Sequence, residues 1–132
     1  MPPCQDPAPP PPIRRAAALA AIKRFIEANL ESESATVPGL CRRFGLSRAS
    51  LYRLFAREGG IARYIQRRRL NRAFAMLASP AGPRARLIDL AVAFQFSSDN
   101  TFIRAFHRHF GLTPGAVRRL SGLSGPLQQI PP

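Results

Sequence analysis

Apolar residues recur along the chain at spacings of three and four, which is the period of amphipathic α-helices. This stripe predicts a first helix over about residues 14–29, built on Leu19, Ile22, Phe25, Ile26 and Leu30. A longer helix is predicted over about residues 61–78, built on Ile65, Leu70, Phe74 and Leu77. No alternating strand pattern occurs, so the sequence predicts an all-α protein of about seven helices.

Residues typical of helix caps divide the middle of the chain. Thr36, followed by a proline in the first turn, predicts a short helix over about residues 37–44 that stops at Gly45. Ser47 then caps a further helix that is expected to run to about Glu58, where two glycines break it. Together these two helices form a first predicted helix-turn-helix over about residues 37–58.

The second half of the chain repeats this arrangement. A short helix over residues 86–94 leads through a turn to Ser97 or Ser98 as a cap and to a helix over residues 99–110, and a last short helix runs from Pro114 to about Leu120. At an offset of 50, Leu40 corresponds to Leu90, and past the turn an offset of 51 places Arg53 on Arg104. The sequence therefore contains two helix-turn-helix units in register, with one residue inserted in the second turn.

The longer helix of each unit has a predicted buried side and a predicted outward side. In the first unit Leu51, Leu54 and Phe55 share the core side, and in the second unit Phe102, Phe106 and Phe110 do so. The outward positions are Ala49, Tyr52, Arg53 and Ala56 in the first unit, and Asn100, Ile103, Arg104 and His107 in the second, with Asp99 at the edge. Such a face suits a helix whose N-terminal end enters a DNA major groove.

The two ends of the chain have a different composition. Residues 1–13 are rich in proline, which predicts an extended, disordered leader. Residues 121–132 are rich in glycine, serine and proline and are expected to form a flexible tail. The folded domain is predicted over residues 14–120.

The net charge of the chain indicates what kind of partner it binds. The chain carries 20 Lys+Arg against 7 Asp+Glu, a formal net charge of +13, and Lys23 is its only lysine. A positive field of this size suits nucleic acid first and an acidic membrane surface second, although an arginine-rich composition is also typical of a GC-rich genome. No run of 18 apolar residues occurs, so a membrane span is not expected.

The residue pattern contains no candidate catalytic site and no candidate metal site. Cys4 and Cys41 lack a metal-ligand spacing, and His107 and His109 are two residues apart instead of the four a helical zinc pair requires. Glu58 and Asp89 are isolated and are interpreted as caps or as partners of arginines. We therefore expect no metal, no cofactor and no enzymatic activity.

The repeat resembles the C-terminal DNA-binding domain of the AraC/XylS family of bacterial transcription regulators. The resemblance covers roughly residues 20–119 and is strongest in LIDLAVAFQFSSDNTFIRAFHRHFGLTPGAVRR, from Leu87 to Arg119. LCRRFGLSRASLYRLFAREGG from Leu40 and YIQRRRLNRAFAML from Tyr64 resemble the first unit and the linker helix. The sequence departs from the family at Gln95, where glycine is usual, which suggests a side chain held at positive φ at some cost.

The resemblance implies a set of DNA contacts. It places base-facing side chains on the outward positions, namely Ala49, Tyr52, Arg53, Asp99, Asn100, Ile103 and Arg104. Contacts to the DNA backbone are expected from Ser47, Arg48, Ser50, Arg57, Arg67, Ser98, Arg108 and Arg118.

The expected partner is double-stranded DNA, and the resemblance adds RNA polymerase and a separate effector-binding or dimerisation domain that this chain does not contain. The expected location is the bacterial cytoplasm, in association with the nucleoid. A basic adaptor that binds RNA or a protein without sequence preference is the alternative. A membrane-active basic helix would need an exposed apolar face, which the predicted core does not leave.

Overall fold

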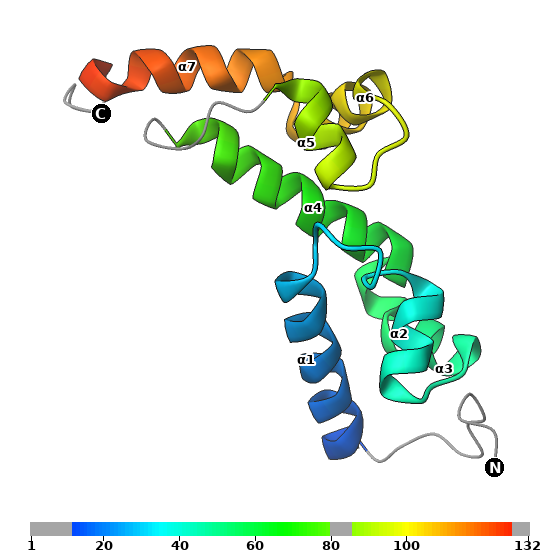
Figure 1. The fold of residues 1–132 in the computed structure, drawn as a ribbon. Helices are drawn as coiled ribbons and strands as arrows, with labels where there is room; N and C mark the ends of the chain where they lie inside the picture. The colour runs from blue at the N-terminus through cyan, green and yellow to red at the C-terminus, as the bar shows by residue number, and fades with distance from the viewer. Residues whose placement is uncertain (1–11, 80–85, 128–132) are drawn as a thin grey trace. The chain divides into compact units, whose positions relative to one another are not determined.

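The computed structural model describes residues 12–79 and 86–127, with side chains described for 14–79 and 86–121. It divides into two compact units, residues 1–68 and 69–132. The described residues form seven α-helices and one 3₁₀ turn and contain no strand, which confirms the all-α prediction (Figure 1). The elements are α1 (Pro12–Ala28), α2 (Val37–Phe44), α3 (Arg48–Leu54), η1 (Ala56–Glu58), α4 (Ile61–Ala78), α5 (Leu87–Ala93), α6 (Asp99–Phe110) and α7 (Pro114–Leu127).

The first unit contains α2 and α3, joined by a turn of the predicted kind. The Thr36 side chain accepts a hydrogen bond from the Gly39 backbone N–H at the start of α2. Gly45 ends the helix at φ 64°, in the left-handed region that favours glycine. Ser47 then caps α3 by accepting a hydrogen bond from the Ser50 N–H. The cap residues therefore determine this turn as the sequence predicts.

One expectation in the first unit is wrong. The helix expected to continue to Glu58 ends at Leu54, and residues 56–58 form a 3₁₀ turn. The Phe55 carbonyl accepts hydrogen bonds from the N–H groups of Glu58 and Gly60, each at 3.0 Å. Phe55 is fully buried, and Glu58 forms ion pairs with residues of other helices. The 3₁₀ turn allows Phe55 to stay in the core while Glu58 reaches these partners.

The core of the first unit joins four of its elements. Ile22 and Ile26 of α1, Leu40 of α2, and Leu51 and Phe55 after the turn are all fully buried. The Phe55 ring lies 5.2 Å from the Tyr64 ring of α4, centroid to centroid. Helix α1 is thus part of the folded unit and begins two residues earlier than predicted.

The second unit repeats the arrangement with α5 and α6, which lie side by side in Figure 1. Of the two candidate caps it is Ser98 that accepts from the Thr101 N–H, and Gly111 ends α6 at φ 76°. In the turn between the helices Gln95 has φ 67° and is the only non-glycine residue at positive φ in the part of the chain described. The prediction of a side chain at positive φ is confirmed.

Phenylalanine rings form the core of the second unit. Phe102 and Phe106 of α6 are fully buried, and Phe94 is 1% exposed. The Phe74 ring of α4 stacks on Phe106 at 6.0 Å and meets Phe110 at 4.7 Å, centroid to centroid. Three phenylalanines at every fourth position of α6 therefore anchor one face of this helix and leave the opposite face outward.

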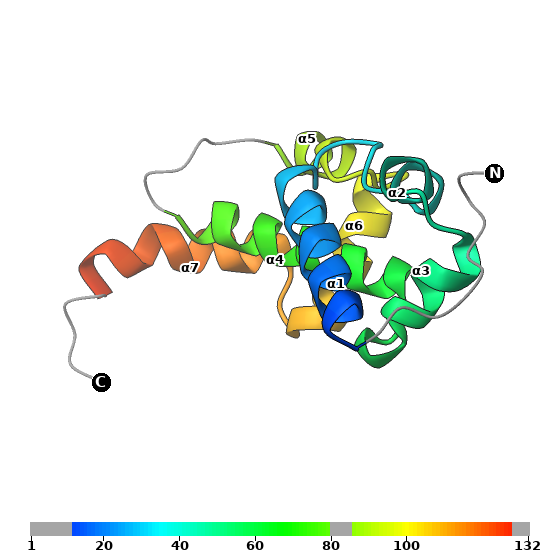
Figure 2. The same cartoon turned by 90° about the horizontal axis from the view of Figure 1, so that it is seen from below.

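Helix α7 is longer than the sequence predicts, because it extends to Leu127 instead of about Leu120. The buried Ser121 hydroxyl donates a hydrogen bond of 2.8 Å to the Ala78 carbonyl at the end of α4. Helix α7 lies beside the C-terminal end of α4 in both views (Figures 1 and 2). This bond anchors α7 to α4 one residue beyond Leu120, where the composition of α7 suggests an end.

The two predicted end segments are only partly described by the structure. Of the predicted leader, residues 1–11 lie outside the described part, and Pro12 and Ile13 belong to α1. Of the predicted flexible tail, residues 121–127 instead continue α7, so the prediction is wrong for these residues, and residues 128–132 lie outside the described part. Among the described residues no helix is both long and apolar enough to cross a membrane.

Candidate nucleic-acid interface

Helix α3 presents the predicted outward residues to solvent. Ala49, Tyr52 and Arg53 are all exposed, and Tyr52 keeps 48% of its surface accessible although aromatic residues are usually more covered. On the opposite side Leu51 and Leu54 are buried. The structure thus brings these three predicted base-facing residues together on one face.

Two serines shape the N-terminal end of α3. The Ser47 hydroxyl donates to the Ser50 Oγ at 3.1 Å while accepting from its backbone N–H. Ser50 is 5% exposed and also accepts a hydrogen bond of 3.2 Å from the Arg53 guanidinium. Ser50 therefore helps to orient the Arg53 side chain. The sequence predicts only a DNA contact for Ser50, so this positioning contact is additional.

Helix α6 presents its own predicted set. Asn100 and Arg104 are exposed, and Asp99 and Ile103 are half-buried beside them. Phe102 and Phe106 lie on the other side with no exposed surface. The four predicted base-facing residues of this helix therefore share one face, which begins at the capped N-terminus beside Ser98.

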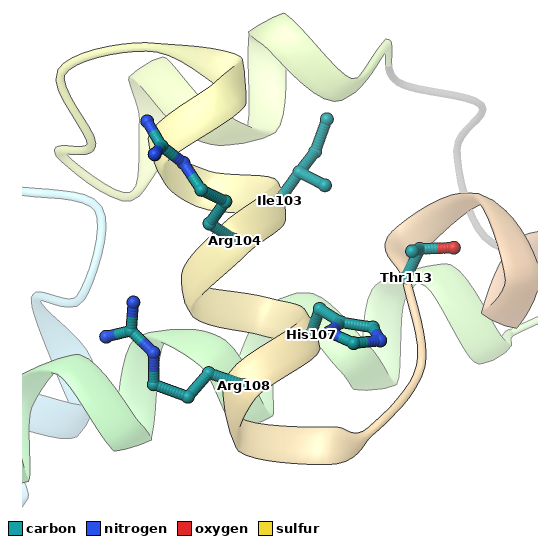
Figure 3. A pocket seen from close by; sticks show the side chains of 5 residues that line it. All are labelled: Ile103, Arg104, His107, Arg108 and Thr113. Atoms are coloured by element: carbon teal, nitrogen blue, oxygen red, sulfur yellow. The ribbon is translucent and has the colours of Figure 1, made fainter.

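An open hollow of about 530 Å³ lies along this face (Figure 3). Ile103, Arg104, His107 and Arg108 line it from α6, and Thr113 lines it from the loop before α7. Figure 3 shows Arg104 and Arg108 extending in one direction, one helical turn apart, with Ile103 and His107 on the side of Thr113. The sequence predicts no DNA contact for His107 or Thr113. Helical spacing places His107 outward, whereas only the folded loop brings Thr113 beside it.

The arginines separate into two groups by their partners. Arg48, Arg57, Arg104 and Arg108 are exposed, and the described residues place no carboxylate within ion-pair distance of them. Arg67 instead pairs with Glu58 at 3.4 Å, and its guanidinium lies 5.8 Å from the centre of the Tyr64 ring. Arg118 is half-buried on α7. The predicted contacts Arg67 and Arg118 are thus less available to a ligand than the other predicted arginines.

Glu58 is the centre of an ion-pair cluster in the first unit. It accepts a hydrogen bond of 2.7 Å from the Lys23 ammonium of α1, and Arg67 lies on its other side. The Lys23 hydrogen bond lowers the pKa of Glu58 against the opposing effect of burial. The interpretation of Glu58 as an arginine partner is correct but incomplete, because Lys23 is 35 residues away in sequence.

Asp89 serves the structure in the second unit as the sequence suggests. It accepts from the Arg86 backbone N–H at 3.3 Å and from the Arg86 guanidinium at 3.2 Å, so it closes a capping box at the start of α5. The hydrogen bond from the Arg86 side chain lowers the pKa of Asp89. The described residues contain no cluster of three or more His, Cys, Asp or Glu that could hold a metal ion.

Comparison with known proteins identifies the family. A family model described as a helix-turn-helix domain matches residues 40–120. A solved structure from Chromobacterium violaceum, described as a transcriptional regulator with an AraC-type DNA-binding domain, is 28% identical with a TM-score of 0.72, covering 83% of this chain and 96% of that one. The chain belongs to the AraC family. Residues 40–120 are therefore a DNA-binding domain of the helix-turn-helix class.

Relatives in the AraC family differ in how much of them this chain spans. The transcriptional regulator Rob of Salmonella typhimurium is 32% identical over 99 residues, which are 74% of this chain and 33% of Rob. The probable transcription factor PqrA of Proteus vulgaris is 30% identical over 100 residues, which are 74% of this chain and 80% of PqrA. The chain thus spans about a third of Rob but most of the length of PqrA.

Proposed function

We propose that the chain regulates transcription by binding double-stranded DNA sequence-specifically, with α3 and α6 each inserted in a major groove. The observation that carries the proposal is the two-sided character of both helices. Each buries the main part of an apolar side and exposes a polar side that includes an arginine, Arg53 or Arg104. This division is what a recognition helix needs, since one side must hold its position while the other meets base edges.

Base readout is assigned to the exposed faces by side-chain chemistry. Arg53 and Arg104 are candidates for bidentate contacts to guanine, and Asn100 is a candidate for adenine. Asp99 fits a cytosine amino group, and the methyl groups of Ala49 or Ile103 fit a thymine methyl. We expect the two helices to read two blocks about one helical turn apart, roughly 34 Å, in successive grooves. A monomer then recognises an asymmetric site.

Backbone contacts are assigned to residues that flank these faces. Arg48, Arg57 and Arg108 carry exposed charge, and Ser47 and Ser98 lie at the capped helix N-termini, where backbone N–H groups also attract phosphate. Loss of one such charge should weaken binding to all sequences alike and reduce the salt dependence by about one unit. RNA polymerase as a partner, control by a separate domain and association with the nucleoid remain predictions.

The test is selection of binding sites from a random duplex library, with wild-type protein, Arg104→Ala and Arg104→Lys. Wild type should return a two-block motif. Arg104→Ala should lose about 1–3 kcal/mol and relax one base pair. Arg104→Lys should relax the same base pair with less loss of affinity, because it keeps the charge without the bidentate geometry. An unchanged motif in both variants contradicts the role of Arg104, and equal binding of RNA and unrelated duplexes favours the basic adaptor.

A further inference from the structure

The hollow on α6 extends beyond the residues assigned to base reading. Ile103 and Arg104 belong to the base-facing set, but His107, Arg108 and Thr113 line the same hollow one turn further toward the C-terminus and in the following loop (Figure 3). A recognition helix contacts bases mainly with its N-terminal residues, so its later turns approach the groove wall. The groove wall is the sugar-phosphate backbone of the DNA.

The lining of the hollow fits that backbone chemically. Its charged side chains are Arg104 and Arg108, both from α6, and no carboxylate lines it from any described element. The Thr113 Oγ1 accepts a hydrogen bond from the Ala116 N–H at 3.1 Å, which leaves its O–H proton available as a donor. The described residues give the exposed His107 ring no hydrogen bond and no ion pair.

We propose that this hollow holds a phosphodiester of the DNA backbone and that His107 is a proton-dependent contact to it. This inference rests on the proposed function. Histidine is the side chain whose charge ordinarily changes between about pH 5 and pH 8, and protonation makes both of its ring nitrogens donors. A protonated His107 adds a third positive charge to the lining of the hollow, on the side of Thr113, and faces a phosphate that carries the compensating charge. Acidification therefore strengthens DNA binding through this residue.

The experiment measures the dissociation constant for a duplex selected by the wild-type protein, at constant ionic strength from about pH 5.5 to about pH 8. Wild type should bind on the order of three- to tenfold more tightly at the acidic end, with a salt dependence steeper by about one unit. His107→Gln should keep the weaker affinity at every pH. His107→Lys should keep the tighter affinity at every pH, because its charge does not change in this range.

His109→Gln is the matched control. His109 is exposed on the same helix but does not line the hollow, and its ring contacts Phe110 at 4.5 Å instead. This variant should keep the pH dependence of wild type. Thermal unfolding should be unchanged in His107→Gln, because the side chain is exposed and buries no core surface.

The outcomes separate this inference from the proposed function. Preferential binding of the selected duplex with the same pH dependence in wild type and His107→Gln overturns the role of His107 and leaves the proposed function intact. Loss of the pH dependence in His109→Gln also overturns it. Absence of preferential binding to any duplex by the wild-type protein overturns both.

Discussion

The two helix-turn-helix units begin alike and end differently. Each has a short helix, a left-handed turn residue and a serine cap, with Ser47 and Ser98 in equivalent places. Helix α3 then stops after 7 residues and gives way to a 3₁₀ turn, whereas α6 continues for 12 residues to Gly111. The repeat in the sequence therefore predicts the start of the second helix of each unit better than its end.

The cause of this difference is what packs against the C-terminal part of each helix. In the first unit the 3₁₀ turn places Glu58 between Lys23 and Arg67, so that polar contacts hold this end. In the second unit Phe106 and Phe110 meet Phe74, so that aromatic contacts hold a continuous helix. The two copies of the motif thus hold the C-terminal part of the second helix in different ways, one with ion pairs and the other with aromatic contacts.

The largest expected effect is a loss of stability, and it compares one core phenylalanine of each unit. Phe55→Ala and Phe106→Ala remove equivalent, fully buried rings, and each should destabilise the protein by about 3–5 kcal/mol. Phe106→Ala should cost more, because Phe106 contacts the rings of Phe74, Phe102 and Phe110 and Phe55 contacts only that of Tyr64 among the described aromatic pairs. Denaturant unfolding measures both losses. A greater loss for Phe55→Ala contradicts the aromatic account of the second unit.

The next effect is a loss of DNA-binding affinity, and it compares Arg53 with Arg104. Arg53→Ala and Arg104→Ala should each weaken binding to a selected duplex by about 1–3 kcal/mol and should alter different blocks of the motif. Because the residues lie in separate units, the double variant should show the sum of the two losses within about 0.5 kcal/mol. Fluorescence anisotropy titrations measure the affinities. If both single variants relax the same base pair, the two helices do not read separate blocks.

A smaller effect tests the two turns. Gln95→Gly should stabilise the protein by about 0.5–1 kcal/mol, since relief of a left-handed side chain outweighs the greater chain entropy of glycine. Gly45→Gln should destabilise it by a similar or larger amount, because Gly45 has φ 64°. Thermal unfolding of both variants measures the shifts. Gln95→Asn, which retains a polar side chain that tolerates this region, should fall between wild type and Gln95→Gly.

The smallest effect concerns the ion pairs. Glu58→Gln should cost at most about 1 kcal/mol, because the pair is partly exposed. The pKa of Glu58 is lowered on folding, so its contribution is present above its ordinary value of 4.5 and is lost as the pH falls through the lower, folded value. Urea unfolding between about pH 3 and pH 7 measures this. Wild type should lose its advantage over Glu58→Gln at the acidic end, and an advantage that persists there contradicts the ion pair as its source.

Much of the fold is predictable because local chemistry fixes it. Thr36, Gly45, Ser47 and Gly111 occupy cap positions whose backbone geometry follows from the residue type. The bounds of α4 and α6 also match the helical spacing. The unusual backbone of Gln95 is predictable from the glycine that the family has at this position.

The rest depends on contacts between residues far apart in sequence. Nothing around Glu58 in the sequence indicates that its hydrogen-bond partner is Lys23, 35 residues earlier. Similarly, the bond from Ser121 to Ala78 spans 43 residues and joins α7 to the end of α4, which the composition of α7 does not indicate. The outward faces of α3 and α6 follow from spacing alone, whereas the place of Thr113 beside His107 requires the folded loop.

The Lys23–Glu58 pair also determines how the chain responds to covalent modification. Lys23 is the only lysine of the sequence, so lysine acetylation has a single side-chain target, which lies on α1 and pairs with Glu58. An acetyl group there removes the charge that Glu58 faces and leaves every guanidinium unchanged. Acetylation would therefore break an ion pair inside the first unit, while the charge carried by the arginines stays the same.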